Sequence, residues 1–126
     1  GELGEVEAAH PRDLTAFVEL IRTLKTLMAP VIKAGMIRLS APDIEMQTSE
    51  GNYTIAGLVI HVRGGRHVSL VPVRSFMSAL VERADLVCGA KRAPITYNET
   101  RNEWQFRGGD HVDERNLSRA LQWLLR

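Results

Sequence analysis

The apolar positions between residues 12 and 31 recur at intervals of three and four residues. Such spacing aligns side chains along one stripe of an α-helix. The stripe consists of Leu14, Phe17, Ile21, Leu24, Met28 and Val31. Pro11 suits a first helical turn, where its missing N–H costs nothing, and Pro30 is expected to kink or end the helix. Leu20 and Leu27 fall on a second stripe, so we expect this helix to be covered on two sides.

After the helix, the pattern changes to short apolar runs separated by turn residues, which is typical of strands. Residues 37–39 and 44–47 are two such runs, and residues 54–63 and 66–73 are two longer ones. The longer runs flank the pair Gly64-Gly65. Glycines at both central positions favour a hairpin with a two-residue turn.

A two-residue turn would fix the register of this hairpin, pairing Arg63 with Arg66 and His61 with Val68. Both faces of the hairpin are then largely apolar. A sheet with one face in water normally alternates apolar and polar residues, so we expect both faces to be covered. The long helix can cover one face, and a second subunit is expected to cover the other. The sequence therefore predicts a homodimer, or burial of the hairpin against a further segment of the protein.

The second half of the chain is expected to form a helix, a hairpin and a final helix. Ser75 can cap the first of these, and its apolar residues stand at helical spacing: Phe76, Met77, Leu80, Val81, Ala84 and Val87. Residues 95–98 and 103–106 read as the two strands of the hairpin. Asp113 can cap the last helix, whose apolar set is Leu117, Ala120, Leu121, Leu124 and Leu125.

These elements predict an α+β fold, an antiparallel sheet with helices in the order α-β-β-β-α-β-β-α. Residues 1–10 are expected to be a disordered lead-in, and residues 11–126 a single domain. The order of elements is similar to that of the small dimeric type III secretion chaperones. This likeness is one of topology alone, and those proteins are typically acidic.

Composition narrows the setting of the protein. The chain has 126 residues, a formal net charge of +1 and one cysteine, Cys88. A single cysteine cannot form an internal disulfide, and its apolar neighbours suggest a buried, unreactive thiol. No apolar run approaches the roughly 20 residues that span a bilayer. We therefore expect a cytoplasmic protein that does not act in a membrane.

The region of residues 54–75 contains basic residues and no acidic one. Arg63, Arg66 and Arg74, together with His67, are the candidate binding residues. Arginine forks bind phosphate or carboxylate, so this hairpin could receive an anionic partner. The alternative is that Arg63 and Arg66 simply point into water at an exposed tip.

Aromatic residues of the second hairpin form another candidate site. Tyr97, Trp104 and Phe106 could stack on nucleic-acid bases, or they could build the core as cross-strand pairs. No metal site is expected, because the predicted register puts His61 and His67 on opposite faces and zinc needs three or four convergent ligands. No cofactor is expected either.

No catalytic motif is recognisable: the chain lacks a nucleophile elbow, a phosphate loop and a dinucleotide fingerprint. We therefore expect a non-catalytic protein-interaction domain, such as an adaptor, chaperone or assembly subunit, that binds another protein and forms a homodimer. The alternative is a nucleic-acid-binding domain that uses the basic 54–75 hairpin and the strand pair of Tyr97, Trp104 and Phe106. Such a domain is usually strongly basic.

Overall fold

The architecture is α+β, as the sequence predicts. The computed structural model describes residues 11–74 and 78–126. Its elements are α1 (Arg12–Lys33), β1 (Ile37–Ser40), β2 (Asp43–Thr48), β3 (Gly51–Ala56), β4 (Leu58–Val62), β5 (His67–Arg74), β6 (Val81–Cys88), β7 (Lys91–Asn98), β8 (Glu103–Phe106), η2 (Arg107–Gly109) and α2 (Glu114–Leu125).

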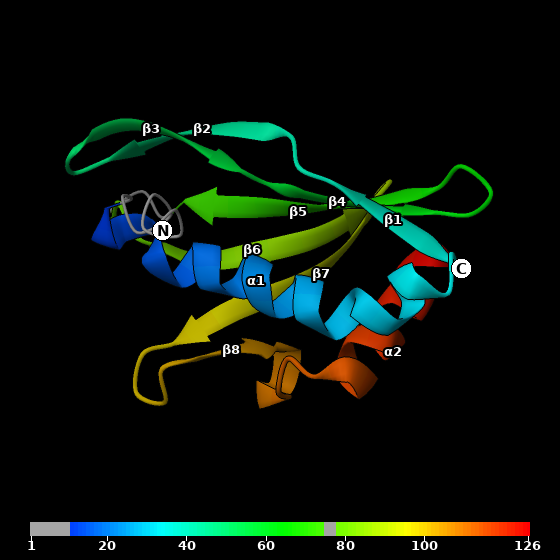
Figure 1. Cartoon of the computed structure of the whole chain (residues 1–126). Coiled ribbons are helices and arrows are strands. Elements are labelled where there is room, and N and C mark those ends of the chain that lie inside the picture. The colour runs from blue at the N-terminus through cyan, green and yellow to red at the C-terminus, as the bar shows by residue number, and fades with distance from the viewer. Residues whose placement is uncertain (1–10, 75–77) are drawn as a thin grey trace.

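Six strands form one antiparallel sheet in the order β1-β4-β5-β6-β7-β8, and β2 and β3 form a separate hairpin. The sheet curls around α1, which lies along its concave side (Figure 1). The β2–β3 hairpin rises beside β5, and α2 packs at the end of the molecule where α1 finishes (Figure 1). No helix among the described residues is both long and apolar enough to cross a membrane.

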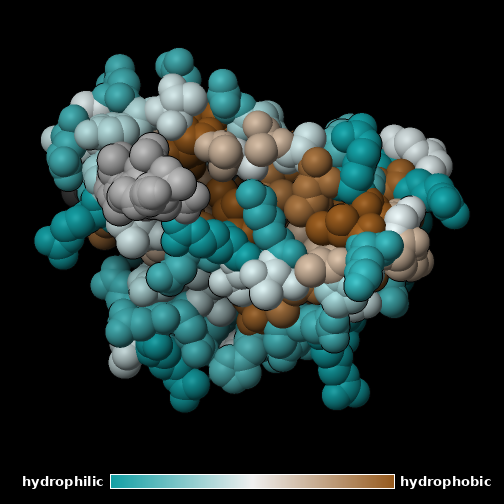
Figure 2. Space-filling model, in the orientation of Figure 1, coloured by the Kyte–Doolittle hydropathy of each residue, from teal (hydrophilic) through white to brown (hydrophobic). Residues whose placement is uncertain are grey.

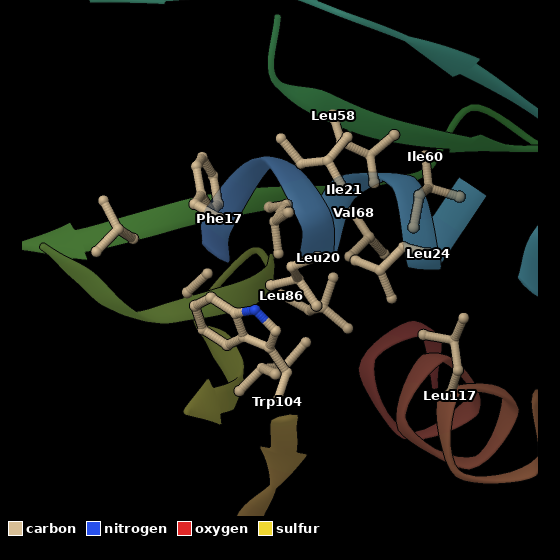
Figure 3. Packing of buried hydrophobic residues seen from close by; sticks show 14 of the residues in the cluster. Phe17, Leu20, Ile21, Leu24, Leu58, Ile60, Val68, Leu86, Trp104 and Leu117 are labelled. Carbon is tan, nitrogen blue, oxygen red and sulfur yellow. The ribbon is translucent and has the colours of Figure 1, made fainter. Parts of the chain in front are cut away.

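The long N-terminal helix forms as its spacing predicts, with Pro11 at its N-cap. Pro30 does not end it, because α1 continues to Lys33. A proline this close to the C-terminus disrupts only the last turn, where few hydrogen bonds remain to be lost. The side chains of α1 that pack into the concave side of the sheet are Leu14, Phe17, Leu20, Ile21, Leu24 and Met28. Figure 3 shows several of them meeting the apolar residues of the sheet.

The hairpin of β4 and β5 differs from the prediction by one residue. His61 pairs with His67, and Ile60 pairs with Val68. The N–H of Val62 donates to the carbonyl of Arg66 at 2.8 Å, which leaves a three-residue loop, residues 63–65, instead of two. A shift of one residue moves a strand's side chains to the opposite face.

This register collects the apolar residues of the hairpin on the core side. Leu58 and Leu70 face each other, as do Ile60 and Val68, and all four are buried. The other side carries Val59, His61, Ser69 and Val71, none of them fully buried. The premise that both faces are apolar is therefore wrong, and the hairpin no longer requires a second subunit to cover it.

A strand replaces the helix expected after Ser75. Residues 81–88 form β6, between β5 and β7, whereas residues 75–77 lie outside the described part of the chain. The pairing shifts between Val73 and Arg74, so Glu82 is the extra residue of a bulge. Side chains on one face of a regular strand are two residues apart, and the extra residue of a bulge makes this separation three. The buried Val81 and Ala84 are therefore three positions apart. Three-residue spacing resembles a helix, which explains the wrong prediction.

Without that helix, the topological likeness to type III secretion chaperones is lost. The second hairpin, by contrast, forms as predicted, with Ile95 opposite Phe106 and Tyr97 opposite Trp104. The final helix is also confirmed. The carboxylate of Asp113 accepts a hydrogen bond from the N–H of Asn116 at 2.8 Å, which satisfies a donor of the first turn.

Candidate docking groove

The largest apolar depression described lies between the second half of α1 and the length of α2. Its volume is about 920 Å³. The apolar side chains that line it are Leu27, Met28 and Val31 from α1, and Leu117, Leu121 and Leu125 from α2. We call this depression the α1/α2 groove. Two neighbouring helices leave such a groove when the apolar stripe of each is wider than the surface that it buries in the core.

The side chains at the floor of the groove are buried in the core, and the side chains of its walls are partly exposed to solvent. Met28 and Leu117 are almost fully buried, at 2% and 3% exposure. Leu27 and Leu121 are half-buried, and Val31 is 37% exposed. Figure 2 shows that polar side chains do not fully cover the face that presents α1, with apolar atoms at the surface mostly above α1 in this view. Uncovered apolar surface of this kind commonly marks a binding site.

The rim of the groove is basic. Exposed Arg115, Arg119 and Arg126 line it together with one acidic residue, Glu114. A ligand that fits this surface would combine apolar side chains for the floor with negative charge for the rim.

The basic residues predicted from the 54–75 region have separate partners in the structure. Arg66 turns toward α2, where its guanidinium donates to the carbonyl of Leu125 and lies 3.9 Å from the sulfur of Cys88. Arg74 donates instead to the carbonyl of Gln47 in β2. Arg63 is exposed at the hairpin tip. These arginines therefore do not converge on one anion in this structure.

His67 lies opposite His61 on the same face, with 6.1 Å between the ring centroids, so the prediction of opposite faces is wrong. The Nε2 atom of His61 is 2.7 Å from the hydroxyl of Ser40. Burial, with the nearby charges of Arg38 and His67, lowers the pKa of His61. Among the described residues, no group of three histidine, cysteine or acidic side chains is arranged to hold a metal ion.

The aromatic rings of the second hairpin, Tyr97, Trp104 and Phe106, pack in or against the hydrophobic core. Tyr97 and Trp104 share a face, with ring centroids 5.3 Å apart, but Trp104 is only 7% exposed. Its indole N–H donates to the carbonyl of Ala16 in α1 at 2.8 Å. Phe106 is 8% exposed. A ring enclosed in this way cannot stack on a base without opening the core, so the geometry favours the structural reading of these residues.

Two details modify the expectations for single residues. Cys88 is half-buried rather than enclosed. The α1/α2 groove itself was not foreseen, although the second stripe of Leu20 and Leu27 pointed to a second covered side of α1. Leu20 is buried in the core, whereas Leu27 lines the groove.

Comparisons with known proteins give no assignment: no protein-family model, no curated protein and no solved structure matches this chain.

Proposed function

We propose that this chain is a non-catalytic protein-interaction domain whose docking surface is the α1/α2 groove. The observation that carries the proposal is the apolar wall of the groove, where Leu27, Val31, Leu121 and Leu125 remain partly exposed among the described residues. Grooves between helices commonly receive an apolar segment of a partner, with charged residues at the rim setting its orientation.

The occupant we propose is the N-terminal segment, residues 1–10, of a second copy of this chain. That segment carries Glu2, Glu5 and Glu7 and no lysine or arginine. Leu3 and Val6, three positions apart, are its larger apolar residues. This combination complements a groove with an apolar floor and three arginines at its rim.

The length of the N-terminal segment favours docking into the groove of a second copy over docking into the groove of its own chain. The rise of α1 from Arg12 to Leu27 is roughly 22 Å at about 1.5 Å per residue. Val6 can extend only about 16 Å from Pro11 at roughly 3.3 Å per residue, and Leu3 about 26 Å. Within one chain, Leu3 alone could reach the start of the groove. Exchange of the segments between two copies would let both side chains enter.

Light scattering coupled to gel filtration tests the proposal on the whole chain. We expect wild type to have the mass of a dimer, and the double variant Leu3→Ser/Val6→Ser to shift toward the monomer. A wild-type monomer at about 100 μM, well above a micromolar Kd, would contradict dimerisation altogether.

A matched pair of variants tests the groove. Val31→Gln should weaken the dimer by about tenfold or more, because it puts a polar amide into an apolar contact. Leu80→Gln is the control, since Leu80 is 39% exposed, close to the 37% of Val31, and does not line the groove. If both variants dimerise like wild type, the groove is not the interface. If Val31→Gln dissociates the dimer but Leu3→Ser/Val6→Ser does not, another surface of the second copy occupies it.

The alternative of a nucleic-acid-binding domain on Tyr97, Trp104 and Phe106 has weaker support. Two of these three rings are buried. Of the arginines in the 54–75 hairpin, Arg66 and Arg74 are turned to backbone carbonyls.

A further inference from the structure

A second depression lies where β8 stops. Strand β8 pairs only with Ile95–Asn98 of β7, so among the described residues no strand lies beside Lys91–Pro94 on that edge. The turn η2 and the helix α2 border this space instead, and together with β7 they line an open basin of about 420 Å³. This volume falls within the range typical of small-molecule sites.

The basin is lined by an unusual excess of arginine. Among the described residues around it, Arg92, Arg107, Arg119 and Arg126 are basic and only Asp110 is acidic. Guanidinium groups that line one depression repel one another, and a bound anion reduces that repulsion. Arginine forks also match the geometry of phosphate oxygens.

Among these arginines, Arg92 is held in place by a buried carboxylate, that of Asp85. The side chain of Asp85 is fully buried, and its carboxylate accepts hydrogen bonds from Arg83 at 2.9 and 3.0 Å and from Arg92 at 2.9 Å. Two guanidinium groups thus share one carboxylate, and the cluster of three side chains keeps a net positive charge. The side chain of Arg92 is still 52% exposed, so it can bind a further anion while Asp85 fixes its position.

An indole ring stands beside these arginines. Trp123 of α2 lines the basin and is 40% exposed, which is unusual for so large an apolar side chain. The ammonium group of Lys91 lies 5.4 Å from the centroid of its ring and donates to the carbonyl of Trp123 at 3.0 Å. The cation–π contact packs Lys91 against the indole, and the hydrogen bond ties its ammonium group to the backbone of α2. A planar ligand ring can stack on an aromatic surface presented in this way.

We propose that this basin binds a nucleotide unit, with its phosphate held by Arg92 and Arg107 and its base stacked on Trp123. An aromatic surface and an arginine cluster in one small cavity match the two halves of such a ligand. A free mononucleotide and the end of a single strand share this chemistry. Arg119 and Arg126 line both depressions, but the residues that hold the nucleotide in this proposal, Arg92, Arg107 and Trp123, do not line the α1/α2 groove.

The two tryptophans of the chain provide the readout. Their indole N–H groups give separate NMR signals, and Trp104 is buried and hydrogen-bonded away from the basin. On titration with adenosine monophosphate we expect the Trp123 signal to move and the Trp104 signal to stay. Adenosine without phosphate, and inorganic phosphate without a base, should each bind about tenfold more weakly or worse.

Variants then test each half of the site. Arg107→Gln should weaken binding of adenosine monophosphate by about tenfold through loss of a charged hydrogen bond. Trp123→Leu should weaken it by a similar factor through loss of stacking, read from the backbone amide signals of η2. Arg101→Gln is the control, because Arg101 is an exposed arginine in the β7–β8 turn that does not line the basin.

The outcomes separate the possibilities. Tighter, salt-sensitive binding of an oligodeoxyadenylate than of the mononucleotide would identify a single strand as the source, and equal or weaker binding would identify the free nucleotide. The proposal is overturned if neither ligand moves the Trp123 signal. It is overturned equally if adenosine binds as tightly as its monophosphate, or if Arg107→Gln binds like wild type.

Discussion

Two leucines of α2, three residues apart, should respond very differently to the same truncation. Leu124 is fully buried, whereas Leu121 is half-buried and lines the α1/α2 groove. The sequence predicted both as part of one apolar set. We expect Leu124→Ala to destabilise the fold strongly, and Leu121→Ala to destabilise it weakly while impairing dimerisation.

The magnitudes follow from burial. Shortening leucine to alanine at an enclosed site removes roughly 2.4 kcal/mol of transfer free energy, at about 0.8 kcal/mol for each carbon group. The cavity left behind raises the cost for Leu124 to about 3–4 kcal/mol. For Leu121 about half of the transfer free energy is at stake, and the vacated space opens into the groove instead of becoming a cavity. Its cost should be about 1 kcal/mol.

Urea denaturation followed by circular dichroism measures both variants against wild type, at one low protein concentration so that association does not contribute. Leu121→Ala should be the more stable of the two variants, with a free energy of unfolding about 2 kcal/mol higher than that of Leu124→Ala. Equal costs would refute the orientation of α2 described here, and with it the wall of the groove. A smaller cost for Leu124→Ala than for Leu121→Ala would mean that the helix is rotated.

The buried carboxylate and the anchoring indole give two further predictions. Burial raises the pKa of Asp85, but hydrogen bonds from its two arginine partners and their charges outweigh burial and hold the pKa below its usual value of 3.8. Its contribution to stability is therefore present above that value and lost as the pH falls through the lower pKa of the folded state. Asp85→Asn should cost about 1–3 kcal/mol at neutral pH, and the difference from wild type should shrink in acid titrations monitored by circular dichroism. A difference that does not change with pH would contradict this account. Trp104→Phe should cost about 1–3 kcal/mol in urea denaturation, because it removes the hydrogen bond to Ala16 as well as core volume. Trp123→Phe, at a 40% exposed position, should cost less than about 1 kcal/mol, and equal costs would show that Trp104 is not anchored as described.

Much of the fold could be read from local patterns. The stripe from Leu14 to Met28 specified α1, because apolar residues at intervals of three and four can share one face only in a helix. Asp113 marked the start of α2 through a hydrogen bond within its own first turn. The alternation around Tyr97 and Trp104 likewise predicted the second hairpin. These features depend on residues close together in the chain.

The candidate sites could be foreseen only in part. The arginines near Gly64-Gly65 were visible as a basic run, but their partners, such as the carbonyls of Leu125 and Gln47, are distant in sequence. The second stripe of α1 indicated that another surface would meet it. Which residues of α2 would form the opposite wall depended on how the two helices pack.

The sequence by itself determined the α+β class, the two terminal helices and the strand-rich region between them. Only the tertiary structure decided that Val81–Cys88 is a central strand, since its bulged pairing with β5 imitates helical spacing. It also decided the register that sets His61 beside His67. The basin brings Arg92 of β7, Arg107 of η2 and Trp123 of α2 together. The physical reason is that pairing register and the meeting of distant elements are set by the packing of the whole core, whereas helix periodicity and capping are set within a few residues.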